Sequence, residues 1–596
     1  MLKKPAQLLT NLVYADFQQK IRFALVGVLN TVTAYLAFMA IYQVSERYLL
    51  SSVLSYFVGM LVSYALNRTF VFNSGKKGGQ FLPFCVVNLT SLACSTGALY
   101  LLVHYGNVHV YVAQALAVCV SMGINYLGYK KVFTDGVSMN RLIQGLYNDD
   151  GRIDPLLVIQ WLVLAVFAVV TALNLHLAMS ANVAHDALPY MDGYGNKFTT
   201  EGRWINFALY YPLHGLPAVI AASLANICIF IFAYKVVMGI KKEYWLAIAV
   251  ALLIVNIPTF TMLLKWPMTL VPGCFMLALF ACCKDKLNAS AMLIVAGILL
   301  FATYPAFYFL MPLLYLSTLK QASYVEIFKF LCFWILGYIL GYAVANSLVY
   351  LYTSMFTDHA TFIHFVSWRQ QNPINSLSSL VDNIAKSAAN FDRLFNYIGQ
   401  LSLWLYVPII LTALWALVKH FKYTIIIILV VISLYASVVP LGVKVPLRSG
   451  VTFPIGMAML LLLIPNKWWR LLTLLALFIP FAYQTHDYNY TYANTRNVMA
   501  EILERNDTHN YLQQPQLFDK VVVSVDKAKM SHYMFEKTQS GAFKTLSNLS
   551  SHYIKPYLYQ YGWKRVNIDV LDVKRSEIKV ETTIKKDGRV LLVSID

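Results

Sequence analysis

The sequence predicts an all-α polytopic membrane protein of about 15 transmembrane helices, followed by a small α+β soluble domain at the C-terminal end. Hydrophobic residues make up 59% of the 596 residues and charged residues only 13%, whereas soluble domains contain about 45–50% and about 25%. Of the 75 Lys, Arg, Asp and Glu residues, 29 follow Gln484. This distribution excludes an ordinary soluble enzyme and predicts a membrane region with one water-soluble tail.

Apolar runs of sufficient length predict the membrane helices. About 20 mostly apolar residues are needed to cross the hydrocarbon core, and backbone groups in lipid must be satisfied within the segment, which favours helices over strands here. Such runs lie near residues 22–42, 50–68, 82–103, 110–130, 156–178, 212–234, 244–262, 268–283, 288–303, 305–319, 327–351, 401–418, 423–439, 450–465 and 470–483.

Basic residues between these runs predict the orientation. Of the 31 Lys and Arg residues before Gln484, 22 fall on the side of the N-terminus and nine on the other side. The positive-inside rule therefore places the N-terminus in the cytoplasm and, with an odd number of spans, the tail outside. The net charge of +19 follows from these short loops, so we expect the lipid bilayer and no nucleic acid as a partner.

The first 135 residues contain a repeat of two similar hairpins. Residues 23–30 match residues 81–88 at an offset of 58, and the hairpin ends Val71-Phe72 and Val132-Phe133 match at an offset of 61. Both predicted hairpins begin and end in the cytoplasm, which makes the repeat parallel. The opening Arg22-Phe23-x3-Gly27-x2-Asn30 and the close Asn67-Arg68-x2-Val71-Phe72 resemble the GtrA-like family over about residues 18–135.

That resemblance implies a four-helix module that moves polyprenyl-phosphate sugars across a bacterial inner membrane, and it leaves open a homo-oligomer formed through this module. Asn30, Asn88 and Asn125 place amides in or near lipid, where each needs a partner. They are interpreted either as hydrogen-bonding contacts between helices or as the lining of a path for the sugar. Asn67 and Arg68 join this predicted lipid-sugar path through the resemblance.

A second resemblance covers residues 156–483. An unusually polar loop, residues 184–204, follows the first span of this region directly. Its position, and the spacing of Asp186 to Gly202-Arg203, resemble the GtrII-like glycosyltransferases of the GT-C type. The apolar runs of this region predict a membrane module of about 11 helices. The GtrII-like resemblance implies an inverting hexosyltransferase. Such an enzyme moves a sugar from an undecaprenyl-phosphate donor to a glycan on the periplasmic side, such as O-antigen or another cell-surface polysaccharide.

Such a transfer needs a base for the acceptor hydroxyl and cations opposite the leaving phosphate. Asp186 and Glu201 are the candidate catalytic residues, with solvated loop acids as the alternative interpretation. The candidate phosphate-binding cations lie in loops where the positive-inside rule disfavours them. They are Arg203, Lys265, Lys444 and Arg448.

Aromatic and polar loop residues are the candidates for sugar or acceptor contacts: Tyr190, Asp192, Trp204, Trp368 and Arg369. The last two belong to an amphipathic, aromatic loop at about 353–400, which is interpreted either as a sugar platform or as a segment lying on the membrane surface. No spacing of ligands predicts a metal site. The GT-C resemblance leaves open a divalent cation, Mg²⁺ or Mn²⁺, and no other cofactor is expected.

These patterns divide the chain into four predicted segments: a GtrA-like module at 1–140, a cytoplasmic linker at 141–155, a GT-C-like module at 156–483 and a periplasmic α+β accessory domain at 484–596. In the last, alternating patterns predict helices near 494–506 and 541–554 and strands near 519–525, 566–573 and 589–595. The alternative function is a non-catalytic transporter of polyprenyl-phosphate sugar, or a transferase acting on protein or lipid A. The acidic outside loop favours a transferase, because a transporter places ionisable residues at the bilayer midplane.

Overall fold

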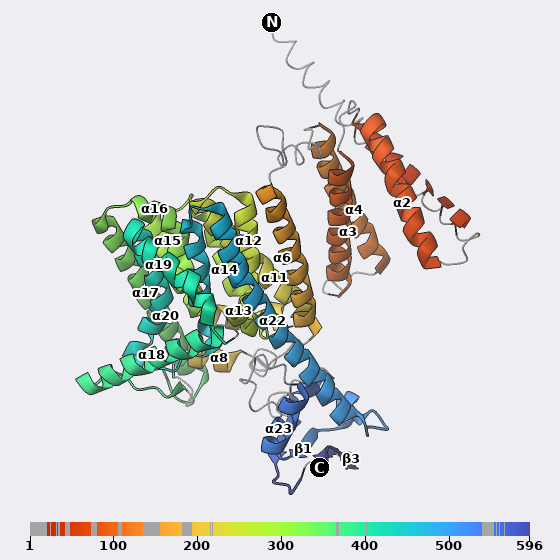
Figure 1. The fold of residues 1–596 in the computed structure, drawn as a ribbon. Coiled ribbons are helices and arrows are strands. Elements are labelled where there is room, and N and C mark those ends of the chain that lie inside the picture. The colour runs from red at the N-terminus through yellow and green to blue at the C-terminus, as the bar shows by residue number, and fades with distance from the viewer. Residues whose placement is uncertain are drawn as a thin grey trace. The chain divides into compact units, whose positions relative to one another are not determined.

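The computed structural model is mostly helical, as the sequence predicts, and two compact units make up the chain, residues 1–158 and 159–596 (Figure 1). The structure describes residues 19–596 apart from residues 20, 24, 31, 34–35, 38, 42–47, 73–79, 105–109, 135–154, 181–193, 215, 217, 365–368, 401–402, 539–553, 556, 560, 565–566 and 578.

The first unit contains α2 (Tyr48–Leu66), the π-helical turn η1 (Asn67–Val71), α3 (Phe81–His104) and α4 (Val110–Thr134). Helices α3 and α4 approach closely at Gly128, where a Cβ atom would lie 2.4 Å from Cγ1 of Val87. Next to this contact the Tyr129 ring stacks on Phe84 at 4.5 Å between centroids. The close packing explains why the second copy of the repeat carries Gly128 where the first carries Asn67.

Several helices of the second unit have the length and composition of membrane spans. Four described stretches are long and apolar enough to cross a bilayer: Pro155–Ala178, Val219–Ile240, Tyr324–Phe356 and Phe421–Leu441. They belong to α6 (Pro155–Ser180), α11 (Ala218–Ile240), α17 (Tyr324–Phe356) and α20 (Phe421–Ser437). The shorter apolar helices of this unit are α12 (Tyr244–Val255), α14 (Pro267–Cys283), α15 (Ala289–Phe301), α19 (Tyr406–Lys419) and the segment Leu447–Leu463 with α21 (Thr452–Leu460) and η8 (Leu461–Leu463). A multi-pass membrane protein is therefore confirmed, while four clear spans fall short of the predicted count of about 15.

Prolines interrupt two of the predicted spans. The run at 244–262 is divided between α12 and α13 (Pro258–Leu263), because Ile257 before Pro258 is extended. The predicted span at 305–319 is wrong as a single α-helix. It consists of the 3₁₀ helix η3 (Pro305–Tyr315), whose residues Ala306–Tyr315 are buried in protein, and α16 (Leu316–Gln321).

The tail continues directly from the helix that contains the predicted span at 470–483. α22 (Lys467–Glu504) passes position 484 without a break, so the predicted helix near 494–506 is its end. It leads through η9 (Tyr511–Gln513) and η10 (Pro515–Leu517) to a sheet of order β2-β1-β4-β3, in which β1 is parallel to both neighbours. The remaining tail elements are β1 (Lys520–Val525), α23 (Lys527–Thr538), β2 (Ile568–Asp572), β3 (Thr582–Asp587) and β4 (Val590–Ile595).

The three predicted strands of the tail are confirmed, and β3 was missed. β3 is a polar edge strand, Thr-Thr-Ile-Lys-Lys-Asp, paired antiparallel with β4, and edge strands carry charge in place of an apolar pattern. Most of the predicted helix near 541–554 lies outside the described residues.

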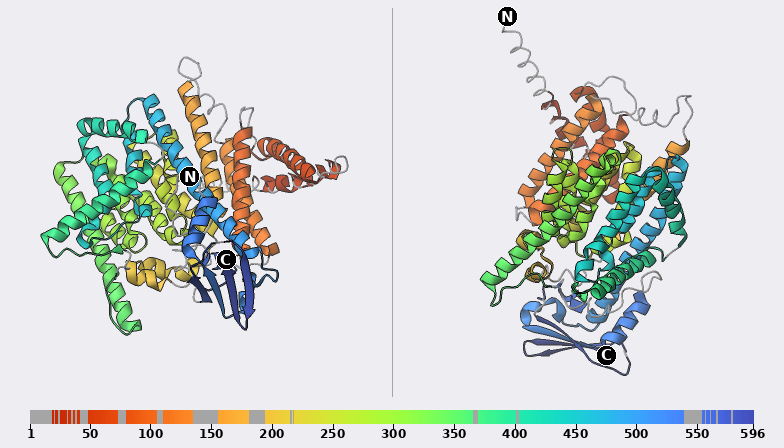
Figure 2. Two further views of the ribbon diagram at one scale, coloured as in Figure 1. Left: turned by 60° about the horizontal axis from the view of Figure 1, so that its bottom comes forward. Right: turned by 90° about the vertical axis from the view of Figure 1, so that its left-hand side faces the viewer.

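Short elements gather at one end of the helices of the second unit, which we call the site end (Figures 1 and 2). They are α8 (Gly195–Glu201), α9 (Trp204–Ala208), α10 (Tyr210–His214), α18 (Leu377–Ile398), η5 (Leu403–Leu405), η6 (Val439–Leu441) and η7 (Leu447–Ser449). The last two lie in one loop, Val438–Gly450, which we call the cationic loop because it carries Lys444 and Arg448.

Candidate functional site

A left-handed turn brings Glu201 and Arg203 together. Glu201 is the last residue of α8, and the next residue, Gly202, has φ +72° and donates its N–H to the Phe198 carbonyl at 2.8 Å. A Cβ atom at Gly202 would also lie 2.7 Å from Cδ1 of Ile363. Both the backbone conformation and the lack of space require glycine here. The turn reverses the chain and returns Arg203 to the carboxylate of Glu201.

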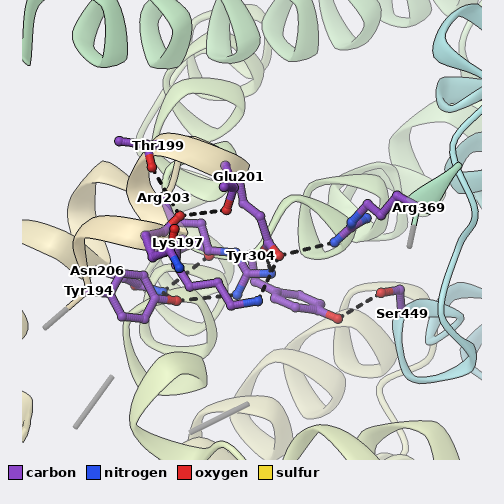
Figure 3. A network of polar contacts seen from close by, with 12 residues as sticks. Tyr194, Lys197, Thr199, Glu201, Arg203, Asn206, Tyr304, Arg369 and Ser449 are labelled. Atoms are coloured by element: carbon purple, nitrogen blue, oxygen red, sulfur yellow. Dashed lines mark hydrogen bonds and ion pairs between the residues drawn. The ribbon is translucent and has the colours of Figure 1, made fainter. Parts of the chain in front are cut away.

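Glu201 is the centre of a buried ion cluster (Figure 3). Its side chain is only 8% exposed and pairs with Lys197 at 2.9 Å, with Arg369 at 3.3 Å and with Arg203. Burial by itself would raise the pKa of Glu201, but Arg203, Lys197 and Arg369 outweigh it and hold the pKa well below its usual range. Glu201 therefore stays ionised at neutral pH, which favours a positioning role over that of a proton acceptor.

Tyrosine side chains hold Arg203 in place. Its guanidinium lies 5.0 Å from the centroid of the Tyr304 ring, and one of its nitrogens donates to the Tyr194 hydroxyl at 3.5 Å. The same hydroxyl accepts a bond from the buried Asn206 amide at 3.2 Å, and the Tyr304 hydroxyl bonds Ser449 at 2.9 Å (Figure 3). Nε of Arg203 is buried without a hydrogen-bond partner among the described residues, so a donor remains for a ligand.

The cationic loop adds Arg448 to this cluster. The Arg448 guanidinium lies 4.3 Å from the centroid of the Trp266 ring, within cation–π range. It lines a small cavity together with Lys197, Arg203 and Arg369. The structure thus brings together four cations and one carboxylate, Glu201, in the linings of the two cavities described here, a formal charge of +3.

The larger cavity, of about 680 Å³, leads from this cluster into an apolar chamber. Glu201, Arg203 and Arg369 form its polar end, and α17, α20, η3 and the cationic loop together supply most of its apolar wall. Two wall residues, Ile339 on α17 and Ile432 on α20, are also 54% and 45% exposed at the molecular surface. Apolar side chains of α17 and α20 that are open to solvent thus form part of the chamber wall.

In the first unit, the amides of the predicted lipid-sugar path differ in their partners. The Asn88 amide oxygen accepts a bond from the Tyr129 hydroxyl at 2.8 Å. The amide oxygens of Asn30, Asn67 and Asn125 are buried without a hydrogen-bond partner among the described residues. Buried amide oxygens of this kind are polar groups that a ligand can satisfy.

The repeat accounts for part of this difference. Asn88 and Tyr129 of the second copy correspond to Asn30 and Arg68 of the first. Arg68 has its guanidinium 5.9 Å from the Tyr64 ring. The two copies are therefore chemically unequal, and the first carries the cation and the unsatisfied amide oxygen of Asn30.

Comparison with known proteins concerns this part of the chain. Residues 22–134 match the family "GtrA/DPMS, transmembrane domain". No curated protein and no solved structure matches the chain. The match supports the GtrA-like resemblance of the first 135 residues, and the GtrII-like resemblance of the second unit stays a prediction. We refer to residues 22–134 as the GtrA/DPMS domain.

Among the other predicted site residues, Lys444 and Trp204 line neither cavity. The Lys444 backbone N–H bonds the Arg369 carbonyl at 2.9 Å, and Nε1 of Trp204 is buried without a partner in the described part of the chain. Asp186, Tyr190, Asp192 and Trp368 lie outside the described residues. Within the described ranges, no group of three or more His, Cys, Asp or Glu is placed to hold a metal ion.

Sequence reasoning missed several residues of the cluster. Lys197 had a usable signal, because it lies four residues before Glu201 and pairs with it across one helical turn. Tyr194 had only its place in the polar loop as a signal. Trp266, Tyr304 and Ser449 had none, since aromatic and small residues beside apolar runs are ordinarily core.

Lys265 lies apart from both cavities, against α22. Its side chain is 1% exposed, and Nζ donates to Asn489 at 2.9 Å and lies 4.9 Å from the Tyr492 ring. Burial lowers the pKa of Lys265 from its usual 10.5 to about 7. The Lys265 amino group therefore contacts Asn489 and Tyr492 instead of the cavity that Arg448 lines.

This buried lysine predicts a pH dependence of stability. Between pH 7 and 10 the unfolded chain binds more protons at Lys265 than the folded chain, so the free energy of unfolding should increase as the pH rises. Lys265→Met should remove this slope and stabilise the protein by about 1–3 kcal/mol at pH 7. Thermal unfolding in detergent across this pH range measures both effects. Lys444→Met, at a partly exposed site, is the matched control, and an unchanged slope in Lys265→Met would contradict the assignment.

Proposed function

We propose that the second unit is a membrane glycosyltransferase that uses a polyprenyl-phosphate sugar, and that the GtrA/DPMS domain binds or moves this lipid-linked donor. The observation that carries the proposal is the larger cavity, in which a cationic end is joined to an apolar chamber. A polyprenyl-phosphate sugar has the complementary parts, a phosphate and a long hydrocarbon chain. The acceptor of the sugar is a glycan.

The cationic end suits a phosphodiester. Arg203, Arg369 and Arg448 present planar guanidinium groups that form forked hydrogen bonds with phosphate oxygens. Glu201 balances only one of the four positive charges, so an anion is attracted to the cluster. The apolar wall between α17 and α20 accommodates prenyl units, each of which favours burial by the hydrophobic effect.

The chemistry of transfer divides between the cations and a base. Phosphate leaves with developing negative charge, which guanidinium groups already fixed by Glu201, Tyr194 and Trp266 stabilise without reorganisation. Asp186, from the polar loop that precedes α8, is the proposed base that takes the proton of the attacking acceptor hydroxyl. Attack from the face opposite the phosphate inverts the anomeric carbon.

A second candidate function is transport of the lipid-linked sugar without catalysis. The match of residues 22–134 to the GtrA/DPMS family favours it. It is also favoured by the state of Glu201, because this carboxylate at the cavity is fully engaged in ion pairs. Under this function the cationic cavity would bind the head group but would not release its sugar.

Purified full-length protein in nanodiscs distinguishes the two. Transferase activity predicts that a panel of short-chain polyprenyl-phosphate hexoses, with a surface polysaccharide as acceptor, gives labelled glycan and free polyprenyl phosphate. Polyprenyl phosphate should compete with the donor, whereas the uncharged polyprenol should not. Binding of the charged lipid without sugar release from any donor would support transport, and equal competition by polyprenol would contradict the phosphate site.

A further inference from the structure

Helix α18 runs across one end of the helices of the second unit, beside the end of α20 (Figures 1 and 2). Its C-terminal end is joined to the start of α19, where the Phe395 and Tyr406 rings stack at 4.1 Å and the Tyr406 hydroxyl donates to the Phe395 carbonyl. It thus lies at the level where the apolar helices end.

Three sides of α18 differ in chemistry. At 100° per residue, positions four, seven and eleven apart share a side. The side that faces protein is buried. It is polar along most of the helix, at Ser379, Asn383, Ser387 and Asn390, and apolar at the C-terminal end, at Leu394, Tyr397 and Ile398. A second side, about a third of a turn away, is apolar: Leu377, Val381, Ile384 and Ala388. The first three of these are 77%, 58% and 52% exposed. A third side carries exposed small and polar residues, among them Ser378, Asp382, Ala389 and Asn396.

The polar buried side holds the cationic loop. The Asn383 amide donates to the Val439 carbonyl at 3.0 Å, and Ser387 donates to the Tyr435 carbonyl at 2.7 Å, just before that loop. A guanidinium nitrogen of Arg393 donates to the Val445 carbonyl at 2.7 Å. The position of α18 therefore sets the position of the loop that carries Arg448.

The surroundings of α18 indicate lipid beside its apolar side. Helix α19 begins where α18 ends and exposes an apolar surface that includes Val407, Ile410 and Leu414. Just before α19, Trp404 is 79% exposed, and tryptophan is enriched at the boundary between hydrocarbon and head groups. A helix at this depth meets protein on one side, hydrocarbon on another and water on the third, which matches the three sides of α18.

We propose that α18 lies in the bilayer interface at the site end, with Leu377, Val381 and Ile384 in the lipid, and that the membrane thereby holds the cationic loop in position. The occupant of the exposed apolar side is the boundary between head groups and acyl chains. This inference concerns the membrane contact alone and does not depend on the proposed transfer reaction.

Photo-crosslinking of the full-length protein tests the contact. The photoreactive residue p-benzoylphenylalanine replaces Val381 or Ile384 in nanodiscs of phosphatidylethanolamine and phosphatidylglycerol, and mass spectrometry counts lipid adducts. We expect adduct yields about five-fold or more above those obtained with p-benzoylphenylalanine at position 382. Asp382 is the neighbour of Val381 and lies on the third, exposed side of α18. Ile339 on α17 serves as the membrane-exposed reference, and Leu571, an exposed apolar residue of β2 in the tail, as the reference outside the membrane.

Two outcomes overturn the proposal: adduct yields at Val381 and Ile384 no higher than at Leu571, or crosslinks there to a second copy of this chain. The effect on the loop is measured separately by hydrogen exchange in nanodiscs. Introducing charge on the apolar side with Ile384→Asp should increase exchange of the Gly442 and Lys444 amides by about ten-fold. Ser378→Asp, on the third, exposed side of α18, should leave the exchange of these amides unchanged. Equal exchange in both variants would show that the membrane does not hold the loop.

Discussion

Arg448→Ala should reduce sugar transfer by about 100-fold or more, because removing one preorganised donor from a developing negative charge typically costs about 3 kcal/mol. The Arg448 guanidinium is fixed 4.3 Å from the Trp266 ring and lines the same cavity as Arg203 and Arg369. Arg448→Lys keeps the charge but loses the forked geometry and the broad stacking surface, so it should be clearly impaired but less than alanine. Initial rates at low and saturating donor measure the series.

Lys444→Ala is the matched control, since Lys444 belongs to the same loop but lines neither cavity. It should retain transfer within about three-fold of the wild type, as expected for a partly exposed cation. Trp266→Leu should fall between the two, because it leaves Arg448 in place without the ring that orients it. Wild-type rates for Arg448→Ala at both donor concentrations would show that Arg448 does not contribute to binding the donor phosphate or to stabilising it as it leaves.

Asp186→Asn should reduce transfer by about 100-fold or more with thermal stability unchanged, because the amide keeps the size of the side chain and removes the base. Glu201→Gln should behave differently. Loss of the carboxylate leaves the buried cations Lys197, Arg203 and Arg369 without their counter-charge, which costs about 3–5 kcal/mol of stability. Paired measurements of transfer rate and of unfolding temperature separate the two roles.

The pH dependence gives an independent check on Glu201. Its pKa is lowered in the folded protein by Arg203, Lys197 and Arg369 against the effect of burial, so its contribution to stability is present above its ordinary pKa of 4.5 and is lost as the pH falls below that value. The wild type should therefore lose stability in acid more steeply than Glu201→Gln. Near-normal transfer by Asp186→Asn would reject Asp186 as the base and would make Glu201 the next candidate, despite its three ion pairs.

Local pattern and composition determined much of this protein. The apolar runs predicted membrane helices such as α11, α17 and α20, because the length of a hydrophobic segment reports directly on its ability to cross a bilayer. The repeat and the Asn67-Arg68 signature predicted the GtrA-like domain, which the family match supports. Alternation of apolar residues predicted β1 and β4 in the tail. Each of these signals lies within one element, where chain neighbours decide the structure.

Only the tertiary structure decided the composition of the site. Glu201 meets Arg369 across 168 residues, and Tyr304 meets Ser449 across 145, distances over which no periodicity of the sequence carries information. Lys265 and Arg448 are both cations of loops at the site end, yet one is buried against α22 and the other lines the cavity. The physical reason is that a loop cation takes its role from the charges and rings that packing places beside it, and packing joins segments that the sequence keeps apart.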